Sequence, residues 1–329
     1  MNEYAVAETE RLREAEGGQG RTAAERWHNL VEMFFDQAEQ LGAMPFLWRK
    51  TGGAWHPTNW DEAARIVASL ATALAASGIQ RGDRVMIVSE NRPEFCLWDL
   101  AVMAAGAVSV PTYISNTVRD HLHVLENSGA AAVVVSTPAL ARTVIEAAFQ
   151  ASACRLVIGI EPLKLDQAHG DLRFADMADL LAAHPADVAK VRSSATMGRP
   201  QLACIIYTSG TGGAPRGVMQ HHGAILHNVA GCLDIILNDF PAISGRDTFL
   251  SFLPPSHAFE HTAGQFLPIA LGGEIYYAEG LERLGANIGE SRPTIMVVVP
   301  RLFEVFRQRI VKEAARKGGM AERMLGHAL

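Results

Sequence analysis

The sequence predicts an α/β protein built from mainly parallel sheets with helices on both faces. Short runs of Val and Ile alternate along the chain with longer segments of helical periodicity, which is the rhythm of a parallel sheet. These runs are apolar throughout, so we expect strands that are buried on both faces. The chain has 329 residues, and domains average about 100–200 residues. We therefore expect two packed, doubly wound α/β/α layers.

Three segments are expected along the chain. Residues 1–26 are charged, contain glycine and show weak periodicity, which indicates a flexible tail. The first α/β subdomain is expected over residues 27–192. After a connector at 193–200 the strand and helix rhythm restarts, so the second subdomain is expected over residues 193–329.

Two amphipathic helices are expected before the first strand of the repeat. Apolar residues recur at helical spacing from Leu30 to Leu41, and Gly42 ends the segment. Asn59 and Glu62 have the spacing of a capping pair, ahead of a helix that ends before Gly78. The elements expected next are strands 84–89, 108–111, 131–136 and 155–160, and helices 93–105, 117–127 and 138–150.

The second subdomain opens with the apolar strand Leu202–Ile206, which leads into a glycine-rich loop at Tyr207–Met219. A loop that directly follows a strand in such a sheet lies where α/β proteins usually bind ligands. The elements expected beyond it are helices 223–237, 262–271 and 301–317, a further helix ending before Pro293, and strands 248–253, 274–278 and 295–299.

Composition and charge exclude several classes of protein. The net charge of −6 and pI near 6.1 give no basic footprint for nucleic acid. The N-terminus lacks the pattern of a signal peptide, and no apolar run approaches the roughly 18 residues of a membrane span. Peripheral contact with a membrane is left open. The cysteines are scattered singly among apolar neighbours, which indicates reduced thiols and a cytoplasmic protein: Cys96, Cys154, Cys204 and Cys232.

The composition of the glycine-rich loop suits a polyanion. Glycines allow backbone N–H groups to turn inward without a Cβ in the way, and such a nest of donors holds phosphate oxygens. The loop also supplies three hydroxyl groups and a fixed positive charge that can join the nest. These side chains belong to Thr208, Ser209, Thr211 and Arg216.

The loop has two other interpretations. A Walker A loop requires Lys and then Ser or Thr after its last glycine, but Gly217 is followed by Val218 and Met219, so this motif is excluded. The second alternative is a solvent-exposed, glycine-rich hairpin turn without a ligand.

A second polar cluster lies at residues 256–261. His257, Glu260 and His261 fit the His-x-x-Glu-His pattern, in which two histidines share a zinc ion and the glutamate acts as a base. This pattern needs one helix that spans both histidines and a further ligand. The adjacent Pro254 and Pro255 place the helix start at about His257 or later, where Ser256 could act as a polar cap.

The loop resembles the phosphate-binding signature of the adenylate-forming superfamily, Tyr-Thr-Ser-Gly-Thr-Thr-Gly-x-Pro-Lys-Gly-Val. The chain departs from it at Gly212, which replaces the second threonine, and at Arg216, which replaces lysine. The segments Leu253–Gly264 and Val299–Phe303 resemble the long-chain fatty acyl-CoA synthetase branch of that superfamily.

This resemblance implies the fold of the large N-terminal domain of adenylate-forming enzymes. It implies activation of a fatty acid with ATP and Mg²⁺ to acyl-AMP, and then transfer to coenzyme A. His257 and Phe259 would line the substrate pocket. Thr208 and Arg216 would be catalytic. The nucleotide-binding set would be Thr208, Ser209, Gly210, Thr211, Gly212, Gly213, Arg216 and Gly217.

The family's later motifs, which carry the magnesium glutamate, the ribose aspartate and the lysine of the swivelling C-terminal domain, have no counterpart before Leu329. We therefore expect an N-terminal part of a longer ligase that does not complete the reaction alone. A non-catalytic module that binds a nucleotide or an acyl group is the alternative.

Overall fold

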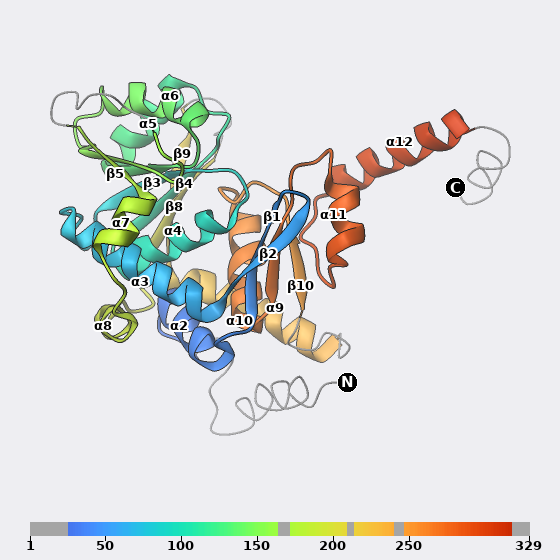
Figure 1. Ribbon diagram of the computed structural model, residues 1–329, viewed down its shortest axis with the longest axis horizontal. Helices are drawn as coiled ribbons and strands as arrows, with labels where there is room; N and C mark the ends of the chain where they lie inside the picture. The colour runs from blue at the N-terminus through green and yellow to red at the C-terminus, as the bar shows by residue number, and fades with distance from the viewer. Residues whose placement is uncertain (1–25, 164–171, 209–213, 240–246, 318–329) are drawn as a thin grey trace. The chain divides into compact units, whose positions relative to one another are not determined.

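The computed structural model describes residues 26–163, 172–208, 214–239 and 247–317 (Figure 1). Apart from Arg26, the tail expected over residues 1–26 lies outside this part of the chain. The chain divides into two units, Met1–Met296 and Val297–Leu329. The first unit contains both β-sheets, and the described part of the second contains helix α12 (Pro300–Lys317).

The smaller sheet has four strands in the order β10-β11-β1-β2. Its strands are β1 (Pro45–Thr51), β2 (Ala54–Asn59), β10 (Thr248–Ser251) and β11 (Glu274–Tyr277). β1 pairs in parallel with β11 and antiparallel with β2. Gly52 and Gly53 connect β1 to β2 with φ values of 59° and 84°, which suits the tight turn of a two-residue hairpin. The sequence analysis did not predict this hairpin.

The larger sheet has seven strands in the order β7-β6-β5-β3-β4-β8-β9. All its neighbouring strands are parallel except β8 and β9, which are antiparallel. The strands are β3 (Arg84–Val88), β4 (Val108–Thr112), β5 (Ala130–Val135), β6 (Leu156–Gly159), β7 (Arg173–Asp176), β8 (Leu202–Thr208) and β9 (Arg216–His221). Strands from before and after residue 192 share each of the two sheets.

The larger sheet separates two hydrophobic cores. Successive side chains of a strand point to opposite faces of its sheet, and β3 shows this clearly. Val85 and Ile87 belong to one core, whereas Met86 and Val88 belong to the other. Helices α3 (Trp60–Ala76) and α4 (Pro93–Ala104) pack in the first core, and α5 (Val118–Ser128) and α6 (Pro138–Ala148) pack in the second. The predicted α/β fold with mainly parallel strands, buried on both faces, is confirmed.

Helix starts follow the polar residues that the sequence places there. The Asn29 side chain caps α2 (Leu30–Leu41) by accepting from Glu32 N–H. Asn59 caps α3 by accepting from Glu62 N–H, and this second cap was predicted. The remaining helices are α7 (Met177–Ala183), α8 (Val188–Ser194), α9 (His222–Asp239), α10 (Leu267–Leu271) and α11 (Leu284–Ser291). Among the described helices, none combines the length and apolar character needed to cross a membrane.

Three expected elements differ from the structure. Strand β9 separates the glycine-rich loop from the following helix. Residues 295–299 contribute only one bridge to the sheet, between Phe249 and Ile295. The helix expected over 262–271 begins with a π-helix, η2 (Glu260–Phe266), before α10. Pro268 lacks the N–H that would bond the Gly264 carbonyl in an α-helix, and Leu267 N–H bonds Thr262 O instead.

Candidate functional site

The glycine-rich loop joins the antiparallel strands β8 and β9. Thr208 pairs with Arg216 at the loop end of this hairpin, and Tyr207 pairs with Gly217 one step further from the loop. Thr208 and Arg216 are both exposed, and Arg216 forms no ion pair with a carboxylate of the described residues. The other five residues of the predicted nucleotide-binding set lie outside the described part of the chain: Ser209, Gly210, Thr211, Gly212 and Gly213.

Gly217 allows the two strands of this hairpin to approach closely. A Cβ atom at Gly217 would lie 2.8 Å from Ile205 Cγ2 and 3.0 Å from Tyr207 Cζ. Tyr207 is buried, so its ring cannot move outward into solvent without leaving the core. The glycine therefore fixes the distance between the strands that carry Thr208 and Arg216.

The second polar cluster begins at an exposed helix start. The side chains of His257 and Phe259 both reach solvent, with Phe259 46% exposed. His257 Nδ1 accepts a hydrogen bond from Phe259 N–H at 3.2 Å. The assignment of these two residues to a substrate pocket stays a prediction.

Glu260, in contrast, is buried in the protein interior. Ser251 Oγ donates to its Oε1 at 2.6 Å, and Asn91 Nδ2 donates to the same Ser251 Oγ at 3.0 Å. The carboxyl group packs directly on Gly264, where a Cβ would lie 2.5 Å from Glu260 Cδ. Burial raises the pKa of Glu260 to about 8, although the Ser251 hydrogen bond opposes this shift.

We expect the protonated form of Glu260 to stabilise the fold. Because its folded pKa of about 8 exceeds the ordinary value of 4.5, this stabilisation is complete below pH 4.5 and is lost as pH rises toward 8. The loss has a slope of up to about 1.4 kcal/mol per pH unit.

Glu260→Gln keeps an acceptor for Ser251 and removes the titration. In denaturant titrations, its stability relative to the original chain should therefore increase with pH, whereas an exposed Glu62→Gln control should show no such trend. If the free energies of unfolding of Glu260→Gln and the original chain change with pH in the same way, the raised pKa of Glu260 is contradicted.

His261 is also buried, and it contacts helix α4. Its Nε2 lies 3.0 Å from Asp99 Oδ2, and Gln265 Nε2 donates to the same oxygen at 2.7 Å. Burial alone lowers the pKa of His261, but the Asp99 carboxylate, together with a smaller effect of Cys204, outweighs burial and raises the pKa to about 10. Asp99 and the imidazolium of His261 therefore form a buried ion pair that joins η2 to α4.

This geometry does not gather the zinc ligands that the His-x-x-Glu-His pattern requires. His257 is exposed, Glu260 is bonded to Ser251, and His261 is bonded to Asp99. Within the described ranges, no group of three or more His, Cys, Asp or Glu side chains could hold a metal ion. The cysteines that the structure describes are all free thiols.

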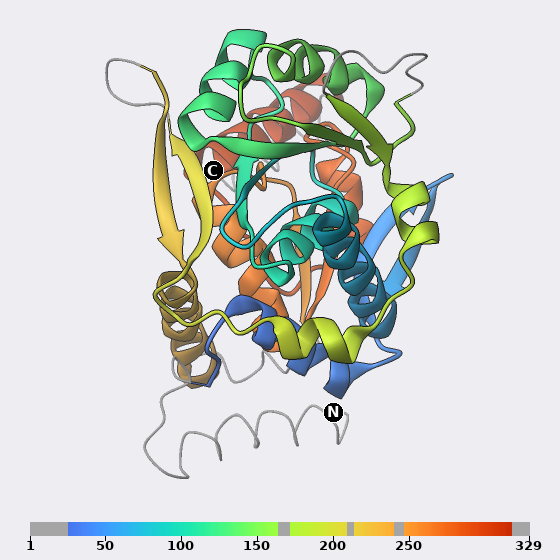
Figure 2. The same cartoon turned by 90° about the vertical axis from the view of Figure 1, so that its left-hand side faces the viewer.

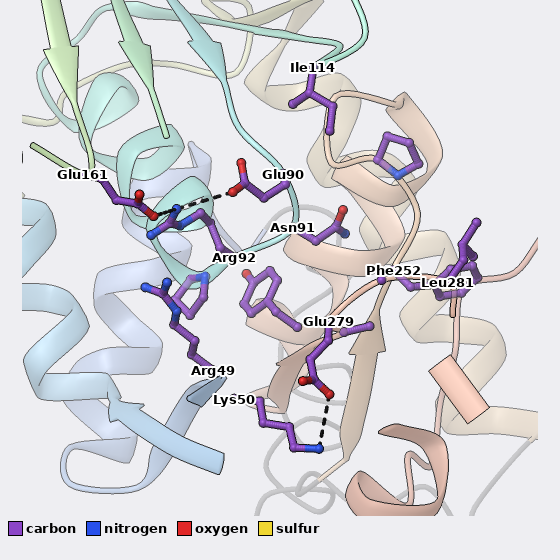
Figure 3. Close-up of a pocket in the computed structure, with 15 residues that line it drawn as sticks. Arg49, Lys50, Glu90, Asn91, Arg92, Ile114, Glu161, Phe252, Glu279 and Leu281 are labelled. Carbon is purple, nitrogen blue, oxygen red and sulfur yellow. Dashed lines mark hydrogen bonds and ion pairs between the residues drawn. The ribbon is translucent and has the colours of Figure 1, made fainter. Parts of the chain in front are cut away.

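A cavity of about 430 Å³ opens where strands of both sheets end (Figure 3). Its lining includes residues that follow the carboxyl ends of five strands. They are Asn91 after β3, Ile114 after β4, Glu161 after β6, Phe252 after β10 and Glu279 after β11. This is the edge at which α/β sheets usually bind ligands.

Ion pairs line this cavity. Arg92 Nη1 lies 3.0 Å from Glu161 Oε1, and Arg92 Nε lies 2.9 Å from Glu94 Oε2. Burial raises the pKa of Glu94, but hydrogen bonding to Arg92 and its positive charge outweigh burial and lower it. Lys50 Nζ lies 3.2 Å from Glu279 Oε2 on the other side. This cavity was not predicted from the sequence, although polar residues directly after the predicted strand at 84–89 were a usable signal.

Comparison with known proteins places this arrangement in a family. Residues 34–328 match the family model described as AMP-binding enzyme. The chain belongs to the AMP-binding enzyme family. The predicted resemblance to adenylate-forming enzymes is therefore confirmed.

Two relatives show which AMP-binding enzymes the chain resembles. It is 29% identical over 297 residues to the long-chain-fatty-acid–CoA ligase FadD15 of Mycobacterium tuberculosis, covering 88% of this chain and 46% of the relative. It is 24% identical to the human long-chain-fatty-acid–CoA ligase ACSBG2, covering 89% of this chain and 44% of that protein. The chain thus spans about half the length of the curated relatives it matches.

Solved structures support the fold of this AMP-binding enzyme. The N-terminal domain of FACL13 from Mycobacterium tuberculosis matches with a TM-score of 0.68 and 21% identity, over 86% of this chain and 65% of that one. A benzoate CoA ligase from Burkholderia xenovorans matches with a TM-score of 0.69 and 22% identity, over 84% and 51% of the two chains. The predicted likeness to the N-terminal domain of adenylate-forming enzymes is confirmed at the level of the fold.

Proposed function

We propose that the whole protein activates a long-chain fatty acid with ATP to form acyl-AMP, and then transfers the acyl group to coenzyme A. The carboxylate oxygen of the acid attacks the α-phosphorus of ATP, and the bond to pyrophosphate breaks. The thiol sulfur of coenzyme A then attacks the acyl carbon, its proton is lost to solvent, and AMP leaves. The names of the long-chain ligases among the relatives support this choice of substrates.

The observation that carries the proposal is the arrangement of residues at the loop end of the β8–β9 hairpin. The Thr208 hydroxyl and the Arg216 guanidinium lie on paired residues there, and both are exposed. The acid supplies its own nucleophile, so the protein chiefly needs to align the reactants and neutralise charge on pyrophosphate. A guanidinium suits this task because it remains charged and can bind two phosphate oxygens.

We propose that Mg²⁺ arrives on the phosphates of ATP, because the described residues form no cluster of metal ligands of their own. Bound there, Mg²⁺ would neutralise phosphate charge. Thr208 and Arg216 would contact the phosphate oxygens alongside it. We also propose that the exposed ring of Phe259 and the imidazole of His257 contact the acyl substrate, since both lie at the exposed start of one helix.

Arg216→Ala should weaken binding of MgATP to the 329-residue chain by about 10- to 100-fold, because a hydrogen bond to a charged group contributes about 1.5–3 kcal/mol. Isothermal titration calorimetry measures this directly. The matched control is Arg65→Ala, which removes an exposed arginine from helix α3 and should leave the affinity unchanged. Equal affinities of Arg216→Ala and the original chain would remove Arg216 from the phosphate site.

We further propose that these 329 residues do not complete the reaction alone, which the 46% coverage of a related ligase supports. Fatty-acid-dependent exchange of pyrophosphate into ATP tests this. The chain should bind MgATP but catalyse little exchange, and exchange at the rate of a full-length ligase would overturn the statement. If the full-length protein also binds ATP without exchange, the protein is a non-catalytic binding module instead.

A further inference from the structure

We propose that helix α5 holds the two sides of the β8–β9 hairpin in position through His123 and Asn127. Neither residue belongs to a motif that the sequence shows. The inference deepens the proposed function, because it assigns positioning residues to the hairpin that carries Thr208 and Arg216.

His123 contacts both sides of the hairpin. Its Nε2 lies 2.8 Å from the carbonyl oxygen of Pro215, the residue that precedes β9. Because a carbonyl only accepts, Nε2 carries the proton and donates. The same ring meets the ring of Tyr207 edge to face, with centroids 6.2 Å apart and planes at 86°. One side chain of α5 therefore spans the end of β8 and the beginning of β9.

Asn127 lies one helical turn after His123 and completes the contact. Its Oδ1 accepts a hydrogen bond from Tyr207 Oη at 2.7 Å. Residues four apart on a helix share one face, so both side chains approach the hairpin from the same side. Tyr207 is followed directly by Thr208, and its ring is the one against which Gly217 packs. The Asn127 bond thus fixes the residue that determines the spacing of the two strands.

Helix α5 is itself held in position by its caps and by the second core. The Thr117 side chain and the Asp120 side chain form a reciprocal capping box at the start of α5, and Gly129 ends the helix in the left-handed conformation. Val124 and Leu125, which lie between the two contact residues, are fully buried in the second core. The helix cannot shift toward or away from the hairpin without opening this core.

The hairpin needs such a support because β9 is an edge strand. Among the described strands it pairs only with β8, and Val218 and Met219 on it are exposed. The hairpin lies at the margin of the sheet, coloured yellow in Figure 2. Without the contacts to α5, β9 and its Arg216 would be held by the β8–β9 ladder, and Thr208 by that ladder and the pairing of β8 with β4. A site that must be ordered when ligand arrives binds more weakly than a site that is already ordered.

The first test measures MgATP affinity of the 329-residue chain by calorimetry. A neutral hydrogen bond contributes about 0.5–1.5 kcal/mol, so His123→Ala and Asn127→Ala should each weaken binding by about 2- to 12-fold. His123→Gln should restore most of the affinity, because its amide can still donate to Pro215. Glu126→Ala, an exposed change on the same helix, should have no effect. Unchanged affinity in both alanine variants would overturn the proposal.

A double-mutant cycle tests the Asn127 contact separately. Tyr207→Phe and Asn127→Ala each remove the same hydrogen bond, so the double variant should bind MgATP no more weakly than either single variant. Additive losses would show that the two residues act independently and would overturn this part of the proposal.

Amide hydrogen exchange without ATP separates this inference from the proposed function. In His123→Ala, exchange should accelerate at 207–208 and 216–221, while the β3 strand stays protected as in the original chain. If Arg216→Ala weakens MgATP binding but His123→Ala changes neither exchange nor affinity, the proposed function stands and the positioning role fails. If the original chain does not bind MgATP but exchange responds as expected, the positioning role stands and the proposed function fails.

Discussion

Asp99→Asn is expected to lower the free energy of unfolding by about 3–5 kcal/mol near pH 7, because removing one partner of a buried ion pair leaves the other without compensation. His261 has no exposed surface, and its Nε2 lies 3.0 Å from the Asp99 carboxylate. Urea unfolding of the two proteins measures the difference. A difference below about 1 kcal/mol would show that the Asp99–His261 contact stabilises the fold no more than an exposed ion pair does.

The pH dependence of this loss distinguishes an ion pair from simple packing. The folded pKa of His261, about 10, lies above its ordinary value of 6.5, so its stabilising contribution is complete below pH 6.5 and is lost as pH rises toward 10. The difference in free energy of unfolding between the original chain and Asp99→Asn should therefore become smaller between pH 6.5 and 10. A difference that stays constant would argue for packing alone. The double variant Asp99→Asn/His261→Gln should lose less than the sum of the two single losses.

Gly217→Val is expected to abolish measurable MgATP binding and to destabilise the protein by about 1–3 kcal/mol, the usual cost of inserting atoms into a packed site. The first atom of the new side chain already meets Ile205 and the Tyr207 ring at or below 3.0 Å. Relief of the clash requires the strands to separate, which moves Thr208 away from Arg216.

A matched control for this substitution exists on helix α9. Gly231 is exposed, and a Cβ there would meet no atom within 4 Å. Gly231→Val should therefore leave MgATP binding unchanged, and its thermal midpoint should stay near that of the original chain. Retention of full affinity by Gly217→Val would show that the β8–β9 spacing is unimportant for the ligand.

The interior strands could be predicted from the sequence because their signal is local. A buried parallel strand is apolar at every position, so the run at Ala130–Val135 is visible without knowledge of its neighbours. The helix caps at Asn59 and Thr117 are also local, since donor and acceptor lie within one turn. Predicted boundaries for these elements fall within one or two residues of the observed ones.

Edge strands lack such a signal. β2 and β9 lie at sheet edges, expose many of their residues and each pair antiparallel with one neighbour, so neither a continuous apolar run nor strict alternation marks them. Residues Leu163–Pro200 likewise showed no clear pattern, yet they include β7, α7 and α8. In each case tertiary contacts determine the secondary structure, because the local sequence has only a weak preference for it.

The candidate site could be predicted only where its residues are close together in the sequence. Thr208 and Arg216 belong to one contiguous motif, whereas the partners of the motif are distant in sequence. His123 lies 92 residues before Pro215, and Asp99 lies 162 residues before His261. Contacts between residues so far apart leave no pattern in the local sequence, so only the folded structure could identify them.

The parallel pairing of β1 with β11 has a consequence for synthesis of the chain on the ribosome. Leu47 of β1 takes Ile275 as its partner, so the β1–β2 hairpin emerges more than 200 residues before its neighbouring strand. During that interval one side of β1 presents unpaired backbone donors and acceptors, which are a template for pairing between chains. Folding of the smaller sheet is therefore a step at which a nascent chain is exposed to aggregation, and chaperone binding during that interval would protect it.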